Sequence, residues 1–207
     1  NCLEFDCRTV ANDSQQLPLI AFDVFIINDG STDNFNSEIY PFLNSNQLNL
    51  KIVENKKNEG LPFSANKGIT QSSAKYIIRV DADDYVNKYF LSELLNNLEN
   101  SDDIDAIACD YLVVDNNENV ISTANCIDEP IACGILFQRK HLLKIGMYDP
   151  SFHCNEEKEL RIRFEKIYKI GRFSKPLYRY RRHDNNLTNN KVFIEKYEKI
   201  LKRKHNL

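Results

Sequence analysis

The sequence lacks several features that would place it in a class at once. Its 207 residues hold no apolar run long enough to span a bilayer, and the N-terminus has no basic segment followed by an apolar one. The chain begins at Asn1 and not at Met. We therefore expect a longer gene product, in which an upstream membrane anchor is not excluded.

The six cysteines lack the spacing of a metal site or of a disulfide framework. They are scattered, and no two of them form a Cys-x-x-Cys pair. This pattern predicts buried thiols in a reducing cytosol, with a catalytic cysteine as the less favoured alternative. The residues concerned are Cys2, Cys7, Cys109, Cys126, Cys133 and Cys154.

The composition is that of a globular protein, with 42% hydrophobic and 28% charged residues and a net charge of −3. Residues 155–207 nevertheless carry 16 Lys and Arg against 7 Asp and Glu. Such a basic segment indicates phosphate groups or an anionic surface nearby, although a solvated helix face explains its last stretch equally well. We expect no nucleic acid partner and a cytoplasmic location, with peripheral contact at the inner face of the membrane left open.

Short β-rich runs alternate with helical ones in the first half. Such alternation predicts a parallel or mixed sheet covered by helices on both faces. Ligands bind these sheets beyond the carboxyl ends of the strands, and Asp29 and Asp81 follow the first and third predicted strands. A buried strand is predicted over residues 22–27, further strands over 48–53, 76–80 and 104–114, and a helix over 86–98.

The second half is more strongly charged. Its pattern predicts a charged helix over 156–168, a run of basic and aromatic residues over 172–182, and a basic amphipathic helix over 192–204. We expect the last helix to dock on the domain or on an anionic membrane surface. Its apolar side would consist of Val192, Phe193, Tyr197, Ile200 and Leu201.

The sharpest chemical feature is Asp81-Ala82-Asp83-Asp84, directly after the third predicted strand. Two carboxylates about 5 Å apart repel each other by ~3 kcal/mol at an effective dielectric of 20, so the cluster is costly unless it is solvated or neutralised. A divalent cation, Mn²⁺ or Mg²⁺, would neutralise it with oxygen ligands and keep coordination positions for substrate phosphates.

Three other interpretations of this cluster stay open. An EF-hand loop starting at Asp81 would need Gly at its sixth position and Glu at its twelfth, where the chain has Val86 and Ser92. A phosphatase-like nucleophile would be followed by a small hydroxyl residue, where the chain has Asp84. A plain solvated turn is the third interpretation, and the cluster alone does not exclude it.

Two earlier motifs are informative because of the order in which they occur along the chain. Asn28-Asp29-Gly30-Ser31-Thr32-Asp33 is by itself a turn with capping residues, and Asn58-x-Gly60 with Asn66-x-Gly68 is unremarkable alone. Followed by the acidic cluster, they resemble the GT-A glycosyltransferases of family 2. The resemblance covers roughly residues 2–190 and continues in Cys133-Gly134 with Phe137, Gly146-x-Tyr148-Asp149, Glu156-Glu157-x-x-Leu160-x-x-Arg163, and Pro176-Leu177-Tyr178 before Tyr180-Arg181-x-His183.

The resemblance implies an α/β fold of the GT-A type, a Rossmann-like nucleotide-diphospho-sugar transferase with a mixed sheet flanked by helices. The glycosyltransferase domain would cover residues 1–190 and precede a basic C-terminal helix over 191–207. Within the domain, a nucleotide-binding half would cover 1–115 and an acceptor and catalytic half 116–190.

The resemblance also implies a missing first strand. Members of this family begin with a central apolar strand and a Pro-x-Tyr-Asn-like loop, whereas residues 2–11 match the helix that follows that loop. An empty slot would leave buried backbone groups unpaired, at about 1–3 kcal/mol each. We therefore expect preceding residues, another segment or another chain to fill the slot, and this sequence alone to bind nucleotide weakly.

Roles on the donor side follow from the same resemblance. Asp29 would contact the nucleobase, with Asn58 and Gly60 in the donor-binding loop. Asp81 would contact ribose or metal, and Asp83 would be the direct metal ligand.

On the opposite side, Arg181 would contact the diphosphate, and His183 would be a further metal ligand. Glu157 stands where the family usually has its catalytic Asp, and we expect it to be the general base. A salt-bridged helix surface is the structural alternative for this acidic segment, since Arg161 and Arg163 follow it.

These roles imply an inverting, metal-dependent transfer of a hexosyl or N-acetylhexosaminyl group from a nucleotide-diphosphate sugar, with a UDP-sugar favoured. The acceptor would be a saccharide or lipid-linked sugar in surface polysaccharide or glycolipid synthesis. One alternative is a non-catalytic GT-A-like module that binds sugar or nucleotide within a larger protein. A nucleotidyltransferase is disfavoured because the start of the chain lacks a glycine-rich, basic phosphate loop.

Overall fold

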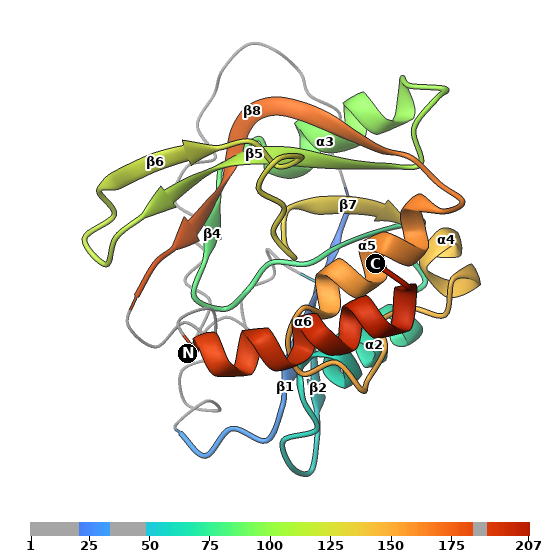
Figure 1. Cartoon of the computed structure of the whole chain (residues 1–207). Helices are drawn as coiled ribbons and strands as arrows, with labels where there is room; N and C mark the ends of the chain where they lie inside the picture. The colour runs from blue at the N-terminus through green and yellow to red at the C-terminus, as the bar shows by residue number, and fades with distance from the viewer. Residues whose placement is uncertain (1–20, 34–48, 184–189) are drawn as a thin grey trace.

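Two sheets form the framework of the computed structural model, which describes residues 21–33, 49–183 and 190–207 (Figure 1). In the smaller sheet, β1 (Asp23–Asn28) pairs in parallel with β2 (Asn49–Glu54). The larger sheet has the strand order β3-β7-β5-β8-β4, with β6 paired to β5. Its strands are β3 (Tyr76–Ile78), β4 (Tyr85–Val86), β5 (Ala106–Val114), β6 (Val120–Ala124), β7 (Ile135–Gln138) and β8 (Ile170–Arg181).

The larger sheet is mixed, because β5 is parallel to β8 and antiparallel to β6 and β7. Successive side chains of a strand point to opposite faces. Ala106 and Ala108 accordingly belong to one apolar core, whereas Ile107, Cys109 and Tyr111 belong to the other. The sheet is therefore buried on both faces, as the alternation of strands and helices predicts.

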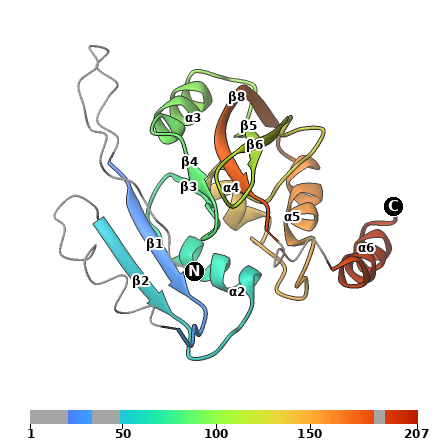
Figure 2. The ribbon, with the colours of Figure 1, turned by 90° about the vertical axis from the view of Figure 1, so that its left-hand side faces the viewer.

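Helices cover both faces of this sheet, and Figure 2 shows α3 and α5 on opposite sides of it. Leu94 of α3 (Phe90–Glu99) packs into one core. Ile69 of α2, Leu142 of α4 and Phe164 of α5 pack into the other. These helices cover Leu61–Gln71 (α2), Arg139–Lys144 (α4) and Glu156–Glu165 (α5).

The predicted C-terminal helix is present as α6 (Lys191–His205) and docks on the rest of the chain beside α5 (Figure 1). Tyr197 and Leu201 are buried with Phe152 in a third apolar cluster. The prediction of its apolar side was wrong for Val192 and Ile200, whose side chains are exposed on the outer surface. None of the described helices has both the length and the apolar character needed to cross a bilayer.

The four predicted strands are confirmed as β1, β2, β3 and β5, but the prediction that the first is buried was wrong, since no residue of β1 is buried. The predicted helix begins later than expected, because Val86 pairs with Tyr178 of β8 and α3 starts at Phe90. Cys109, Cys126 and Cys133 are buried free thiols and Cys154 is partly buried. Cys2 and Cys7, with the helix expected over 2–11, lie outside the described residues.

Within the described residues, β1 pairs only with β2, and β3 pairs only with β7. Figure 2 shows the two-stranded sheet standing apart from the larger one. This arrangement is compatible with a strand slot between β1 and β3. What fills the slot stays a prediction.

Candidate active site

The first part of the site is a loop held by Asp29 at the carboxyl end of β1. The pairing of Asn28 with Glu54 brings Asp29 beside Asn55, the residue after β2. Asn55 Nδ2 donates to Asp29 Oδ1 at 2.8 Å, and the backbone N–H groups of Glu59 and Gly60 donate to the same carboxylate at 2.8 and 2.9 Å. Although burial raises the pKa of Asp29, these bonds lower it overall, so the group is an anion at neutral pH.

Two glycines with positive φ lie in this region, and the first allows the loop to approach the end of β1 closely. A Cβ on Gly30, whose φ is +70°, would lie 2.6 to 2.9 Å from backbone atoms of Lys57 and Asn58. Gly60, with φ +91°, precedes α2. The predicted donor-side residues Asp29, Asn58 and Gly60 thus lie together, with Asn58 on the exposed side of the loop.

Sequence interpretation missed Asn55, which is buried and also donates to Ser64 Oγ at 2.9 Å. The parallel pairing of the first two predicted strands could have revealed it, since polar residues just after paired parallel strands meet at one edge.

The second part is the Asp81-Ala82-Asp83-Asp84 loop, in which each carboxylate has its own partner. Arg79 donates two hydrogen bonds to Asp81, at 2.7 and 2.9 Å. Asp83 Oδ2 lies 2.9 Å from His183 Nε2, at hydrogen-bonding distance. Asp84 accepts from Tyr178 Oη at 2.7 Å. The expected repulsion within the cluster is therefore relieved mainly by separate partners.

Asp84 fastens this loop to β8. Its buried carboxylate also accepts from the backbone N–H of Arg181 at 2.7 Å. Burial, together with the charges of Asp83 and Asp81, raises its pKa to about 7 despite these hydrogen bonds. The anchored loop brings Asp83 to His183, 100 residues away in sequence. The guanidinium of Arg181 lies 5.6 Å from the ring centre of Tyr85 on the neighbouring strand.

Among the described residues, Asp81, Asp84 and Cys133 also offer potential ligand atoms within 4.8 Å of one another. Burial raises the pKa of the Cys133 thiol well above its usual value, and hard cations prefer oxygen to sulfur. Asp81 and Asp84 are already bound to Arg79 and Tyr178. The pair of Asp83 and His183 offers a carboxylate oxygen and an imidazole nitrogen 2.9 Å apart.

The third part is the start of α5, which carries Glu157. Asn155, with φ +58° in the left-handed region, precedes the helix, and acidic residues in its first turn complement the helix dipole. Glu157 borders a small apolar pocket beside Ile131 and Tyr148. Burial and the charge of neighbouring Glu156 raise the pKa of Glu157 to about 7. A carboxyl group with such a pKa can accept a proton near neutral pH.

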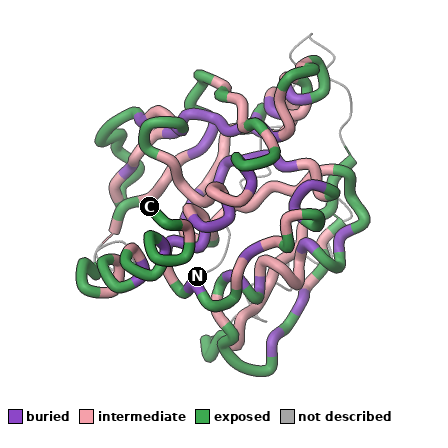
Figure 3. Tube along the Cα trace, turned by 45° about the vertical axis from the view of Figure 1, so that its right-hand side comes forward, coloured by how far each residue is buried: buried purple, intermediate pink, exposed green. Residues whose placement is uncertain are grey.

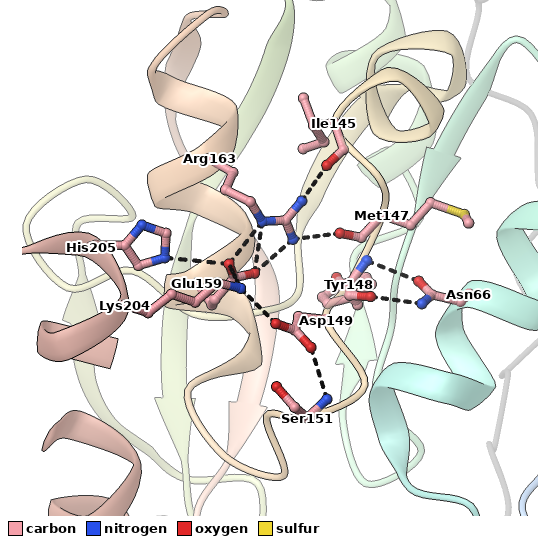
Figure 4. A network of polar contacts seen from close by, with 10 residues as sticks. All are labelled: Asn66, Ile145, Met147, Tyr148, Asp149, Ser151, Glu159, Arg163, Lys204 and His205. Atoms are coloured by element: carbon pink, nitrogen blue, oxygen red, sulfur yellow. Dashed lines mark hydrogen bonds and ion pairs between the residues drawn. The ribbon is translucent and has the colours of Figure 1, made fainter. Parts of the chain in front are cut away.

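A structural network continues along α5, as Figure 4 shows. Glu159 is fully buried and accepts from Arg163 and from Lys204 of α6 at 2.6 Å each, while His205 Nε2 lies 3.3 Å from it. Lys204 also donates to Asp149 at 2.5 Å. Of the two arginines on α5, Arg163 thus pairs with a buried carboxylate that docks α6, whereas Arg161 pairs with Glu165 at the exposed end of the helix.

Asn66 of the Asn66-x-Gly68 motif is also structural (Figure 4). Its side chain donates to Tyr148 O at 2.8 Å and accepts from Tyr148 N at 2.9 Å. It thus holds α2 against the segment that leads to α5.

Comparison with known proteins places this geometry in a family. The profile of glycosyl transferase family 2 matches residues 8–155. That range contains Asp29, Asp81 and Asp83 and ends just before Glu157. The protein described as uncharacterized glycosyltransferase YibD, from Escherichia coli (strain K12), is 36% identical over 89 residues, or 43% of this chain and 25% of that protein. The chain spans about a quarter of the length of the first curated relatives that it matches.

Two solved structures have the same fold. Staphylococcus aureus TarS 1-349 in complex with UDP matches with a TM-score of 0.65 and 20% identity, over 81% of this chain and 53% of that one. Mannosyltransferase PcManGT from Pyrobaculum calidifontis, in complex with GDP-Man and Mn²⁺, matches with a TM-score of 0.64 and 14% identity, over 83% of this chain and 51% of that one. The fold is that of the GT-A glycosyltransferases, and the chain belongs to glycosyl transferase family 2.

Proposed function

We propose that this chain is the catalytic domain of an inverting, metal-dependent glycosyltransferase that transfers a hexosyl or N-acetylhexosaminyl group from a nucleotide-diphosphate sugar to an acceptor hydroxyl. One observation carries the proposal. Arg79 joins Asp81, on the Asp83-bearing loop, to Glu156, directly before the candidate base Glu157. Donor-binding and proton-accepting groups would therefore face one reaction space.

The donor would bind along the carboxyl ends of β1 and β3. Asp29 would accept a hydrogen bond from the nucleobase, beside Asn58 and Gly60. Asp81 is better suited to a ribose hydroxyl than to a cation, because Arg79 already neutralises it while its carboxylate keeps lone pairs for a neutral donor. Arg181 would approach the diphosphate.

Asp83 and His183 fit a divalent cation, since two lone-pair-bearing atoms 2.9 Å apart either share a proton or can share a metal ion. The imidazole favours Mn²⁺ over Mg²⁺ in this pair. When bound, the cation would act as a Lewis acid toward the charge that develops on the leaving diphosphate.

Glu157 would take the proton from the acceptor hydroxyl. As that oxygen bonds to the anomeric carbon, the bond from this carbon to the nucleoside diphosphate breaks, and the pair of electrons leaves with the diphosphate oxygen. A single displacement of this kind inverts the anomeric centre. Because Glu157 must be ionised, kcat should rise with pH through about 7, the value to which burial raises its pKa.

A UDP-sugar is the favoured donor, supported by the fold likeness to TarS in complex with UDP, and a GDP-sugar is the alternative that the likeness to PcManGT suggests. The acceptor would be a saccharide or lipid-linked sugar of surface polysaccharide or glycolipid synthesis. We propose a cytoplasmic location, with the outer, lysine-rich side of α6 touching the inner face of the membrane.

Release of nucleoside diphosphate from a panel of UDP- and GDP-sugars, with Mn²⁺ present, tests the proposal. Glu157→Gln should retain calorimetric binding of UDP with Mn²⁺ and lose about 10²- to 10⁴-fold in kcat. Asp83→Ala should lose the heat of that binding.

The matched control is Glu165→Gln, at the exposed end of the same helix, where the carboxylate bonds only to Arg161 among the described contacts. It should behave like the wild type. Turnover that survives Glu157→Gln would place the base elsewhere, and donor binding without any turnover in the wild type would favour a non-catalytic GT-A-like module.

A further inference from the structure

Arg79 is an arginine at the end of an otherwise apolar strand segment, and its side chain is only 17% exposed. Its guanidinium is held on two sides. Nε and Nη2 donate to the two oxygens of Asp81 at 2.7 and 2.9 Å, and Nη1 donates to Glu156 Oε1 at 3.1 Å. One planar cation thus binds two carboxylates that lie 75 residues apart in sequence.

The two carboxylates belong to the two halves of the proposed site. Asp81 lies on the donor side, at the start of the acidic loop, and Glu156 is the first residue of α5, directly before Glu157. Only 11% of the Glu156 side chain and 29% of the Asp81 side chain are exposed. Solvent therefore screens these contacts less than it screens surface ion pairs.

A lysine could not replace this contact. The guanidinium presents its donors in a fixed planar fork, so the orientation of Asp81 is set along with its position. An ammonium group supplies the same charge from one point and does not fix the plane of a carboxylate. The difference gives a way to separate geometry from charge.

We propose that Arg79 is a positioning residue for glycosyl transfer, which orients Asp81 for the donor and fixes the start of α5 relative to it through Glu156. The inference rests on the proposed function, in which Glu157 is the base. It adds a residue outside the three sequence motifs and predicts that donor binding and base strength are coupled through one side chain.

The charges around Glu157 provide the diagnostic. Burial and the negative charge of Glu156 raise the pKa of Glu157, whereas the positive charges of Arg79 and Lys158 lower it. Burial and the negative charge of Glu157 raise the pKa of the Cys154 thiol, just before the helix, so this thiol stays neutral. Tyr148 and Arg161 also border the same pocket. Removing Arg79 should therefore move the acid limb of the pH profile of kcat to higher pH, and removing Glu156 should move it to lower pH.

The experiment measures nucleoside diphosphate release with Mn²⁺ for Arg79→Lys, Arg79→Gln and Glu156→Gln, normalised to the folded fraction from circular dichroism. Arg79→Lys should raise the donor KM by about tenfold, as expected for a lost charge-assisted hydrogen bond, and leave the pH profile in place. Arg79→Gln should raise the KM and also move the acid limb to higher pH. Glu156→Gln should keep the KM and move the limb to lower pH.

The control is Arg172→Gln, which breaks another two-point pair, with Asp110, between β8 and β5. It should change neither the KM nor the pH profile. The inference is overturned if the Arg79 variants lose only folded fraction, with an unchanged KM and acid limb, or if both kinds of substitution shift the limb the same way. If Glu157→Gln retains turnover, the proposed function fails first, which is a distinguishable result. If Arg79→Gln does not fold, the KM of Arg79→Lys and the pH profile of Glu156→Gln still test the proposal.

Discussion

The two sheets of this protein are built very differently. Six of the nine residues of β5, from Ala106 to Tyr111, are buried in succession, and helices cover both of its faces. In β1 no residue is buried, and in β2 only Val53 is. Figure 3 maps buried, intermediate and exposed residues along the described trace.

This difference separates the two tasks of the proposed site. The groups that would perform proton transfer and metal binding stand on the well-packed sheet and its helix α5. The group that would hold the nucleobase, Asp29, stands on the two-stranded sheet and is positioned by hydrogen bonds to the loop of residues 55–60. We infer that catalytic geometry is fixed by packing and that the nucleobase side is completed by ligand or neighbouring chain segments.

The largest expected effect tests the contrast in packing. Phe164 of α5 is fully buried and packs edge-to-face on Phe137, with ring centres 5.0 Å apart. Phe164→Ala should lower the free energy of unfolding by about 3–5 kcal/mol. Ile27→Ala in β1, which removes a partly buried side chain beside Gly68, should cost less than half as much. Urea denaturation followed by circular dichroism measures both, and equal losses would remove the contrast.

The second prediction concerns pH, because the pKa values of Glu157 and Asp29, one from each region, are shifted in opposite directions. The pKa of Glu157 is raised to about 7, so its stabilising contribution is full below its unfolded value and is lost as pH rises through about 7. The pKa of Asp29 is lowered, so its contribution is present above its unfolded value and is lost as pH falls. Glu157→Gln should therefore raise stability at pH 8 by about 1–3 kcal/mol and have little effect at pH 4.

Thermal denaturation between pH 3 and pH 8 measures this slope. Asp29→Asn should flatten the acid side of the curve and leave the alkaline side unchanged. A Glu157→Gln variant that is no more stable than wild type at pH 8 would show that the carboxylate is well solvated. It would then be a weaker candidate for a base tuned to neutral pH.

Much of the fold could be predicted from sequence, because it depends on local patterns, whereas the contrast in burial between the two sheets was not predicted. Apolar runs predicted the strands, and the position of Asp29 and Asp81 after two of them is confirmed. The family resemblance and the GT-A fold are confirmed as well. The roles of the site residues stay predictions.

What sequence interpretation missed depends on distant partners. Arg79 was treated as part of a strand, since nothing local indicates that its second partner is Glu156. Glu159 belongs to the acidic segment for which a salt-bridged surface was the alternative interpretation, and its docking to Lys204 of α6 and to Arg163 makes it a buried charge. An arginine in an apolar strand and three glutamates on one helix are signals that a charge is buried, but not where its partner lies.

A third prediction tests the dependence of the two-stranded sheet on ligand. Backbone amides of β1 and β2 should exchange with deuterium faster than those of β5, because few apolar contacts oppose local opening. UDP with Mn²⁺ should slow exchange over residues 23–33 and 54–60 by about tenfold at saturating concentration and leave β5 unchanged. Hydrogen exchange followed by mass spectrometry measures each segment. Equal protection of both sheets without ligand would contradict the proposed division.

The smallest expected effect tests whether burial or surface ion pairing causes the difference between the two sheets. Each region has an exposed ion pair, Lys51 with Asp23 across β1 and β2, and Lys158 with Glu198 between α5 and α6. Exposed pairs gain little, because water screens the charges and ordering two long side chains costs entropy. Lys51→Met and Lys158→Met keep most of the aliphatic stem and should leave both denaturation midpoints within measurement error. If Lys51→Met selectively speeds exchange in β1 and β2, surface charge and not burial holds that sheet together, and its loose packing would no longer explain why ligand should order it.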